Sequence, residues 1–429
     1  MNLLRCVRAA LLTAALVGAG DQVFAQDSFA YRATPETPEV RRIVASSEAQ
    51  ACARLGHIDL RRARETGDPA HYTKAEASFK KALDLDPQNV EAMGGMGSLC
   101  LSRHRFAEAL AWGERAVALN PHNVFLHGVI VDARVELGDY ERAVEALQGM
   151  MDLRPGLSAY ARASYLRELM GDPDGAVEAM EMAVRAGGPN AGEAVWCQAQ
   201  LGNLHFGQGD LRSAEARYRG ALARLPNDAH ALAGLGRVRA AQRDWAGAAA
   251  LYEQALAAMP EHAFAEALGD VYRAMGREEE AERRYADARA LLRAEEANGA
   301  DVDLEMALFE ADQGLDLKDA TDRQSDALAR ARREMARRPS SIHAADALAW
   351  ALYRAGDSEE ALSTIRQALR LGTRDARMLF HAGMIAYRAG EREEARKYLE
   401  QALAINPHFS IRHADEAASV LRKLGKAGE

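Results

Sequence analysis

The sequence predicts an all-α solenoid of about ten helix-turn-helix units, closed by a C-terminal capping helix. Three observations support this prediction: a small residue that returns about every 34 residues, a glycine in the middle of most units, and a proline between many of them. Self-similarity at such a period is typical of stacked repeats, which share no single central core.

The most regular feature is an alanine that marks the second half of each unit. Small side chains let neighbouring helices approach closely, and alanine is the best helix former. A second small residue follows seven positions later in most units, as at Ala82 and Ala221. Each unit therefore reads as two short helices, A and B. The recurring alanines are Ala75, Ala109, Ala143, Ala176, Ala214, Ala248, Ala281, Ala327, Ala361 and Ala395.

Glycine and proline punctuate these units at separate places. Gly138, Gly209 and Gly390 are examples of the mid-unit glycine, where a left-handed C-cap would end helix A. Pro121 and Pro155 stand 34 residues apart between units, where proline stops helix B. The pattern thus predicts where each helix ends.

One unit carries nearly the whole pattern of a known family. It contains Leu201-Gly202, His205, Gly209, Ala214, Tyr218, Ala221 and Pro226. This arrangement resembles the tetratricopeptide repeat (TPR) family, and the resemblance extends over roughly residues 50–410. It implies a right-handed superhelix in which the A helices line the concave face.

The N-terminus predicts export. Arg5 and Arg8 precede an apolar stretch at residues 9–20, and Ala25 ends a small-x-small-like exit. We interpret residues 1–25 as a secretory signal peptide cut after Ala25, with an uncleaved anchor as the alternative. The expected location is periplasmic or secreted, with no membrane span after cleavage.

The rest of the chain divides by repeat spacing. In one unit the spacing grows by about a dozen residues, and the added stretch from Asp316 to Asp326 is polar. An open stack also needs a terminal helix with a polar outer face. The predicted parts are an extended lead-in at 26–45, about seven repeats at 46–297, a degenerate repeat with an enlarged polar loop at 298–341, two repeats at 342–409, and a capping helix and tail at 410–429.

The charge and the cysteines of the chain argue against several classes of ligand and crosslink. The net charge of −9 is spread along the chain without a basic stripe, so nucleic acid is not an expected partner. After signal cleavage Cys52, Cys100 and Cys197 remain, an odd number with neither metal-site nor disulfide spacing.

No motif predicts catalysis, a cofactor or a metal. Gly94-Gly95-Met96-Gly97 lacks the lysine of a phosphate loop and falls inside a helix A. The acidic residues of Asp301 to Glu305 suit a helix N-terminus better than a metal. His408 and His413 have no third ligand nearby in the sequence and are expected in loops or on the surface. The chain is therefore not expected to be an enzyme.

The TPR resemblance implies that certain helix-A positions point into the concave groove. Aromatic residues with interspersed arginine and aspartate suit a peptide-binding groove, although the aromatics could instead pack between adjacent A helices. By register these positions hold Phe125, Asp132, Arg162, Tyr165, Trp196, Asn203, Phe206, Arg237, Asp270, Arg273, Asp346, Trp350, Tyr353, Phe380 and Tyr387.

These features lead to a functional hypothesis. We expect a non-catalytic protein-protein interaction scaffold of the cell envelope that binds a protein or peptide partner along the groove. The alternative is an accessory or assembly subunit that positions an enzyme or its substrate in an envelope maturation or biogenesis system.

The packing hypothesis makes a direct prediction. Ala214→Leu should lower the free energy of unfolding by about 1–3 kcal/mol, because the larger side chain overpacks the space between helices. Urea denaturation followed by circular dichroism measures the loss. An unchanged unfolding midpoint would contradict a close-packed role for the recurring alanine.

Overall fold

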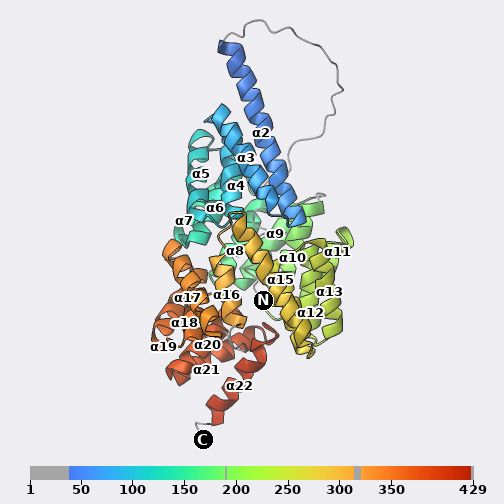
Figure 1. The fold of residues 1–429 in the computed structure, drawn as a ribbon, viewed down its shortest axis with the longest axis vertical. Helices are drawn as coiled ribbons and strands as arrows, with labels where there is room; N and C mark the ends of the chain where they lie inside the picture. Colours follow the sequence, from blue (N-terminus) through green and yellow to red (C-terminus); the bar gives the residue numbers. More distant parts are fainter. Residues whose placement is uncertain (1–37, 189–190, 314–319, 427–429) are drawn as a thin grey trace.

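The protein folds as a continuous array of paired helices (Figure 1). The computed structural model describes residues 38–188, 191–313 and 320–426. Over those residues it has 21 helices and no strand, as the sequence predicted for an all-α repeat solenoid. The predicted signal peptide at 1–25 lies outside the described residues.

Ten A–B helix pairs and one terminal helix make up the array. The A helices are α2 (Pro38–Thr66), α4 (Val90–Ser102), α6 (Val124–Leu137), α8 (Leu157–Leu169), α10 (Ala191–Gly207), α12 (Ala229–Ala241), α14 (His262–Ala274), α16 (Asp303–Gln313), α18 (Ile342–Ala355) and α20 (Ala376–Ala389). The B helices are α3 (Ala70–Leu85), α5 (Phe106–Leu119), α7 (Tyr140–Leu153), α9 (Pro173–Ala186), α11 (Leu211–Arg224), α13 (Trp245–Ala258), α15 (Glu278–Ala297), α17 (Ala320–Arg337), α19 (Ser358–Ala368) and α21 (Arg392–Ile405). The terminal helix is α22 (His413–Lys426).

Polar caps begin many of the A helices. The side chains of Asn89, Asp228 and Asp375 each accept a hydrogen bond from a backbone N–H three residues on, at 2.8 Å. Such caps satisfy N–H groups that the helix itself leaves unpaired. Gly138 ends α6 in the left-handed conformation, at φ 83°, as expected for the mid-unit glycine.

A bulky B-helix side chain holds neighbouring repeats together. Tyr218 on α11 is fully buried between Gly202 of its own repeat and Gly234 of the next. A Cβ atom at Gly202 would stand 2.6 Å from Tyr218 Cε1, and one at Gly234 would be closer still. The recurring alanines are also buried, for example Ala214 at 0% exposure. Side chains of minimal size therefore set the distance between helices.

The array winds far enough to touch itself. Asp301 N donates to the carbonyl of Arg103 at 2.8 Å, and Asn406 Nδ2 donates to the carbonyl of Phe206 at 2.7 Å. Ile342 N donates to the hydroxyl of Tyr140 at 3.1 Å. We call α2–α13 the first superhelical turn, α14–α22 the second, and the line of contacts between them the seam (Figure 1).

The seam contacts recur in register. The A–B turn of each first-turn repeat meets the connection that follows the B helix five repeats later. The paired positions are Gly67 with Met259 and Pro260, His104 with Asp301, Gly138 with Ser340, Gly171 with Gly372, Gly209 with Ile405 and Asn406, and, from α22 in place of a connection, Arg243 with Asp415.

Two of these turns have no glycine. His104 and Arg243 adopt positive φ values of 58° and 61°. A non-glycine residue in this conformation costs roughly 1 kcal/mol. His104 Nδ1 lies 3.1 Å from the Asp301 carbonyl, and Arg243 Nη2 lies 3.3 Å from Asp415 Oδ2. Both side chains therefore reach across the seam.

The extended lead-in expected at 26–45 is wrong from residue 38 onward, because α2 begins at Pro38. Proline is tolerated in the first turn of a helix, where its missing N–H would have no partner. Residues 26–37 lie outside the described part of the chain.

The enlarged loop expected in the degenerate repeat is also largely wrong. The added residues lengthen the flanking helices: α15 has 20 residues and α17 has 18, whereas most A and B helices have 13 or 14. Helix α17 starts at Ala320, within the stretch expected to be a loop. Its polar residues support one another at helical spacing, since Arg330 Nε donates to Asp326 at 3.3 Å.

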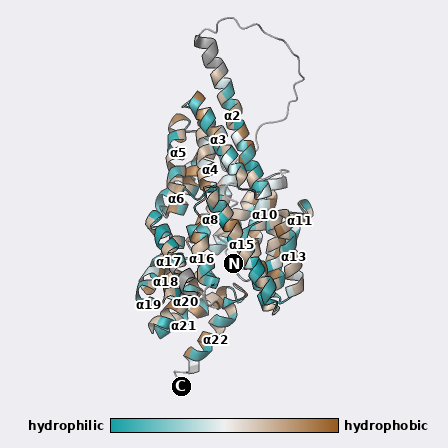
Figure 2. Cartoon of the chain, in the orientation of Figure 1, coloured by the Kyte–Doolittle hydropathy of each residue, from teal (hydrophilic) through white to brown (hydrophobic). Residues whose placement is uncertain are grey.

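None of the described helices is long and apolar enough to cross a membrane. Figure 2 shows hydrophilic residues interrupting the hydrophobic ones along the helices. Cys52, Cys100 and Cys197 are free thiols.

The contact around Tyr218 predicts a pair of opposite effects. Gly202→Ala should lower the free energy of unfolding by about 1–3 kcal/mol, because the buried ring cannot move away from the new methyl group. Gly149→Ala, on α7, adds a methyl group where no atom lies within 4 Å. That control should raise stability by about 0.5–1 kcal/mol through helix propensity. Urea denaturation of both variants tests the contrast, and equal effects would contradict it.

Candidate binding site at the superhelical seam

Most of the predicted groove residues are not on an open surface. Ten of the fifteen are buried: Asp132, Arg162, Tyr165, Trp196, Asn203, Phe206, Asp346, Trp350, Tyr353 and Phe380. The other five, Phe125, Arg237, Asp270, Arg273 and Tyr387, are partly exposed. The tight winding of the array closes most of the concave face. Of the fifteen residues, only the five partly exposed ones are still predicted to contact a partner.

The first buried set is an ion pair between neighbouring A helices. Arg162 donates from Nε and Nη2 to the two carboxylate oxygens of Asp132, at 2.8 and 2.6 Å. Burial raises the pKa of Asp132 to about 6, although the Arg162 charge opposes this. A buried pair of this geometry holds helices α6 and α8 in register.

A second buried cluster fills the interior of the second turn. Asp312 on α16 accepts hydrogen bonds from Trp350 Nε1 at 2.8 Å and from Arg377 Nη2 at 2.5 Å. Arg412 Nη2 donates to the Asp312 carbonyl at 3.0 Å. Burial acts to raise the pKa of Asp312, but the charge of Arg377, together with those of His413 and Arg412, outweighs burial and holds that pKa well below its usual range. Four elements, α16, α18, α20 and the segment before α22, thus meet at one residue, Asp312.

This cluster changes the role of Trp350. Its ring is 1% exposed and stacks on His381 with ring centroids 4.2 Å apart. Removing such a side chain would cost about 3–5 kcal/mol of stability. Trp350 therefore packs the interior, and its replacement cannot serve as a clean test of partner binding.

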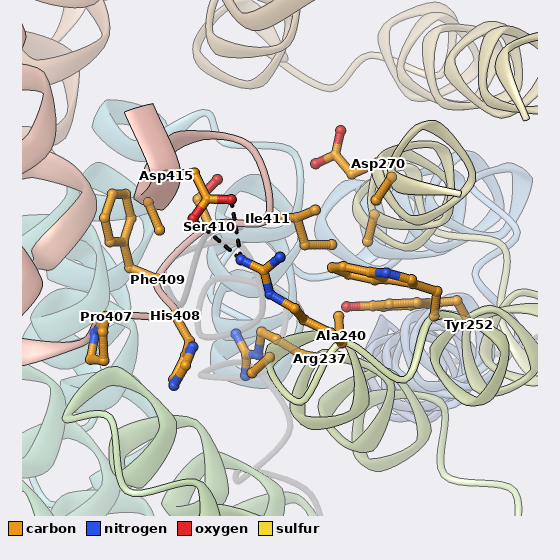
Figure 3. Close-up of a pocket in the computed structure, with 16 residues that line it drawn as sticks. Arg237, Ala240, Tyr252, Asp270, Pro407, His408, Phe409, Ser410, Ile411 and Asp415 are labelled. Atoms are coloured by element: carbon orange, nitrogen blue, oxygen red, sulfur yellow. Dashed lines mark hydrogen bonds and ion pairs between the residues drawn. The ribbon is translucent and has the colours of Figure 1, made fainter. Parts of the chain in front are cut away.

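An open cavity remains where the seam reaches its C-terminal end. It has a volume of about 360 Å³ and lies between helices α12–α14 and the segment from Pro407 to Asp415 (Figure 3). Tyr252 and the half-buried Trp245 form an aromatic wall, and Arg237 and Asp270 supply charge. We call this space the seam cavity. It contains two of the predicted groove residues.

The charges of the seam cavity are already oriented. Arg237 Nη2 donates to the hydroxyl of Tyr218 at 2.7 Å, and its guanidinium lies 4.4 Å from the centre of the Phe206 ring. Asp270 accepts from the hydroxyl of Tyr285 at 2.8 Å. Burial raises the pKa of Asp270, while the nearby Arg412 opposes the change. Fixed polar groups beside aromatic surface suit recognition of a partner side chain.

A second cavity lies further along the seam, between α8–α10 and α20–α21. Its volume is about 380 Å³, and it brings together the predicted residues Tyr165 and Phe206. Tyr165 Oη lies 3.5 Å from His343 Nε2, on a helix 178 residues away in sequence. The lining also includes Glu168, whose pKa is raised to about 8 by burial and by the charge of Asp375.

Sequence reasoning missed Trp245 and the whole Pro407–Asp415 wall of the seam cavity. Trp245 begins a B helix, where the groove register assigns no contact. The Pro407–Asp415 segment closes the cavity only because the superhelix returns to its own first turn. In the sequence, a tryptophan that the repeat pattern does not require was a signal that could have pointed to this site.

The polar residues considered for metal binding have protein partners. Asp303 accepts hydrogen bonds from Arg330, Arg333 and Arg337, at 2.7–3.0 Å. His413, expected in a loop or on the surface, is instead buried and stacks on Phe380 with ring centroids 4.8 Å apart. In the described ranges no three His, Cys, Asp or Glu residues are placed to hold a metal ion.

Comparison with known proteins identifies the repeat. Residues 60–124, 199–263 and 347–408 match the family described as "Tetratricopeptide repeat". A curated relative, "Cellulose synthase operon protein C" of Xanthomonas axonopodis pv. citri (strain 306), is 30% identical over 206 residues. The alignment covers 44% of this chain but only 12% of that relative's length.

Two solved structures illustrate the likeness in fold. TTC0263 of Thermus thermophilus, a thermophilic TPR protein, shares 23% identity over 43% of this chain and 94% of its own, with a TM-score of 0.38. PilW, a type IV pilus biogenesis factor, shares 16% identity over 48% of this chain and 93% of its own, with a TM-score of 0.40.

Glu168 makes the stability of the seam depend on pH. Its pKa in the folded chain is about 8, above the ordinary 4.5, so the folded state retains a proton that the unfolded chain releases. Stability should therefore fall as pH rises from about 4.5 to about 8, by up to about 1.4 kcal/mol per pH unit.

Glu168→Gln should remove this slope and make the protein more stable than the parent chain above about pH 8. Urea midpoints at about pH 5 and about pH 9 measure it. Glu178→Gln, at an exposed position on α9, is the matched control and should follow the parent chain. A slope unchanged in Glu168→Gln would rule out this assignment.

Proposed function

The chain is a tetratricopeptide repeat protein, and we propose that it is a non-catalytic scaffold that binds a protein partner at the seam cavity. The repeat fold supports protein interaction in general, and it usually binds rather than catalyses. The single observation that carries the proposal is the seam cavity, where Trp245 and Tyr252 stand beside Arg237 and Asp270.

The chemistry of the seam cavity suits a peptide or loop. Its volume of about 360 Å³ falls within the usual range for specific sites, about 300–1,000 Å³. An aromatic or aliphatic side chain of the partner would pack against Trp245. Polar groups of the partner would bond to Asp270 or to the exposed Arg243–Asp415 pair at the rim.

We place this activity in the cell envelope. The support is the sequence of residues 1–25, in which two arginines precede a short apolar stretch and a small-residue exit. A mature chain beginning after Ala25 would then be periplasmic or secreted.

A second candidate is an accessory subunit that positions an enzyme or its substrate. The name of the curated relative refers to a cellulose synthase operon, which supports a setting beside an envelope-building enzyme. The two candidates differ in stoichiometry: an accessory subunit should co-purify with one enzyme at a fixed ratio, whereas a general scaffold should capture several partners.

Site-specific photocrosslinking tests the seam cavity. A photoreactive phenylalanine analogue at Trp245 should yield discrete protein adducts in cells, because partner atoms would lie within contact distance of this wall. The same analogue at Trp112, a half-buried tryptophan on α5 outside the cavity, is the matched control. Adducts that are equal at both positions, or absent at Trp245, would contradict the assignment.

Affinity for the captured partner gives a second readout. Trp245→Ala should weaken binding about tenfold or more, as expected for a central aromatic anchor. Trp112→Ala should leave the affinity unchanged. Fractionation of the adducts with cytoplasmic proteins alone would contradict the envelope location without affecting the cavity.

A further inference from the structure

The seam is a repeated contact that stops at the two ends of the molecule. Along the seam, the first-turn glycines are in close contact with the second turn. A Cβ atom at Gly138 would overlap the carbonyl of Ser340, and one at Gly171 would overlap the carbonyl of Gly372. The equivalent second-turn glycines, Gly276, Gly356 and Gly390, have no described atom within 4 Å of an added Cβ. We call these three turns the second-turn edge.

The opposite end of the molecule has the complementary elements. The last residues of α3, α5, α7 and α11, with the connections that follow them at 85–89, 119–123, 153–156 and 224–228, belong to the first turn. The connection after α9 is only partly described. The second-turn equivalents of the four connections form the seam, whereas these connections meet no further turn within the described part of the chain. We call them the first-turn edge.

One stretch of the first-turn edge repeats a seam sequence almost residue for residue. Leu119-Asn120-Pro121-His122 ends α5 as Ile405-Asn406-Pro407-His408 ends α21. In the seam, Asn406 is 1% exposed and donates to a first-turn carbonyl. On the free edge, Asn120 is exposed and Leu119 is 44% exposed.

Most of the exposed large apolar side chains belong to the first-turn edge or to α2. Seven large hydrophobic side chains are exposed among the described residues, and five lie on the first-turn edge or on α2. The five are Leu55, Ile58, Leu119, Leu153 and Leu225, at 37–51% exposure. Leu55 and Ile58 are three residues apart on α2, the first helix of the described array. Removing these apolar side chains from water would favour packing of this part of the molecule against another surface.

We propose that the chain self-associates head to tail, with the second-turn edge of one copy packed on the first-turn edge of the next. This arrangement continues the contact that the seam already makes within one copy. It would also bring α22 of one copy beside α2 of its neighbour, where it covers Leu55 and Ile58 as a further A helix would. The contact is heterologous, so it generates an open series of copies rather than a closed two-fold dimer.

A second copy of this chain fits the first-turn edge better than an unrelated partner does, because the seam already shows which surface packs against such connections. The seam shows what the edge accepts: a row of A–B turns at the spacing of the repeats, each with a glycine or a tolerated left-handed residue. Among the described residues, the second-turn edge has three such turns, at Gly276, Gly356 and Gly390, and the turn between α16 and α17 lies outside the described residues.

Analytical ultracentrifugation of the purified chain tests the proposal, from about 1 μM to about 200 μM. The mean mass of the parent chain should rise with concentration beyond that of a dimer. The double variant Leu119→Glu with Leu153→Glu should prevent packing of the first-turn edge. The double variant Ala355→Glu with Ala389→Glu, at exposed helix ends, should prevent packing of the second-turn edge. Each double variant alone should be a monomer, with association weakened at least tenfold.

Mixing the two double variants distinguishes the head-to-tail contact from other dimers. Each variant retains the edge that the other lacks, so the mixture should form a one-to-one complex and nothing larger. A parent chain that is monomeric throughout would overturn the proposal. So would a dimer that persists in either variant alone, because that dimer must use another surface.

Crosslinking protects the test against a variant that fails to fold. In the parent chain, a photoreactive analogue at Leu153 should join another copy at the Gly356 or Gly390 turn, identified by mixing light and heavy isotope-labelled protein. Adducts at Val144, exposed on the same B helix as Leu153 but away from its end, should not form. Intermolecular adducts mapped elsewhere would overturn the proposed contact.

Discussion

The structure depends on one recurring contact. In it, a bulky B-helix side chain packs between two successive A helices, against residues that have little or no side chain. Tyr218 between Gly202 and Gly234 is the clearest example, and Phe79 between Gly56 and Gly95 repeats it. These contacts fix how far each repeat rotates relative to the previous one. Because the rotation accumulates, the chain returns to contact its own earlier repeats after five repeats.

That return explains where the polar residues of the A helices go. In an open superhelix these residues would line a groove. Here the two turns lie in contact, and most A-helix residues of the second turn are buried. Charged groups forced inside must then be paired, since an isolated buried charge is very costly. Asp132 with Arg162, and Asp312 with Arg377, meet this requirement. Positions that suit ligand binding in an open array act in packing in this one.

The proposed binding site therefore lies at the boundary between the two turns, and not in an open groove. The seam cavity combines residues from an A helix, Arg237 and Asp270, with residues that belong to no groove position, Trp245 and the segment beginning at Pro407. Its shape depends on the register of the seam, so anything that shifts one turn relative to the other changes the cavity. If a partner binds in this cavity as proposed, its binding and the stability of the seam depend on the same contacts.

The sequence by itself determined the helices, their pairing and their repetition, because the contacts responsible are local: caps such as Asn89, turn glycines such as Gly138, and alanines such as Ala214 act within one repeat or on the next. It also pointed to Arg237 and Asp270. Only the tertiary structure decided which A-helix residues stay accessible and that Trp245 lines a cavity. The seam joins residues about 200 positions apart, such as Phe206 and Asn406. Its existence depends on the sum of many small rotations between repeats, and no single repeat contains that sum.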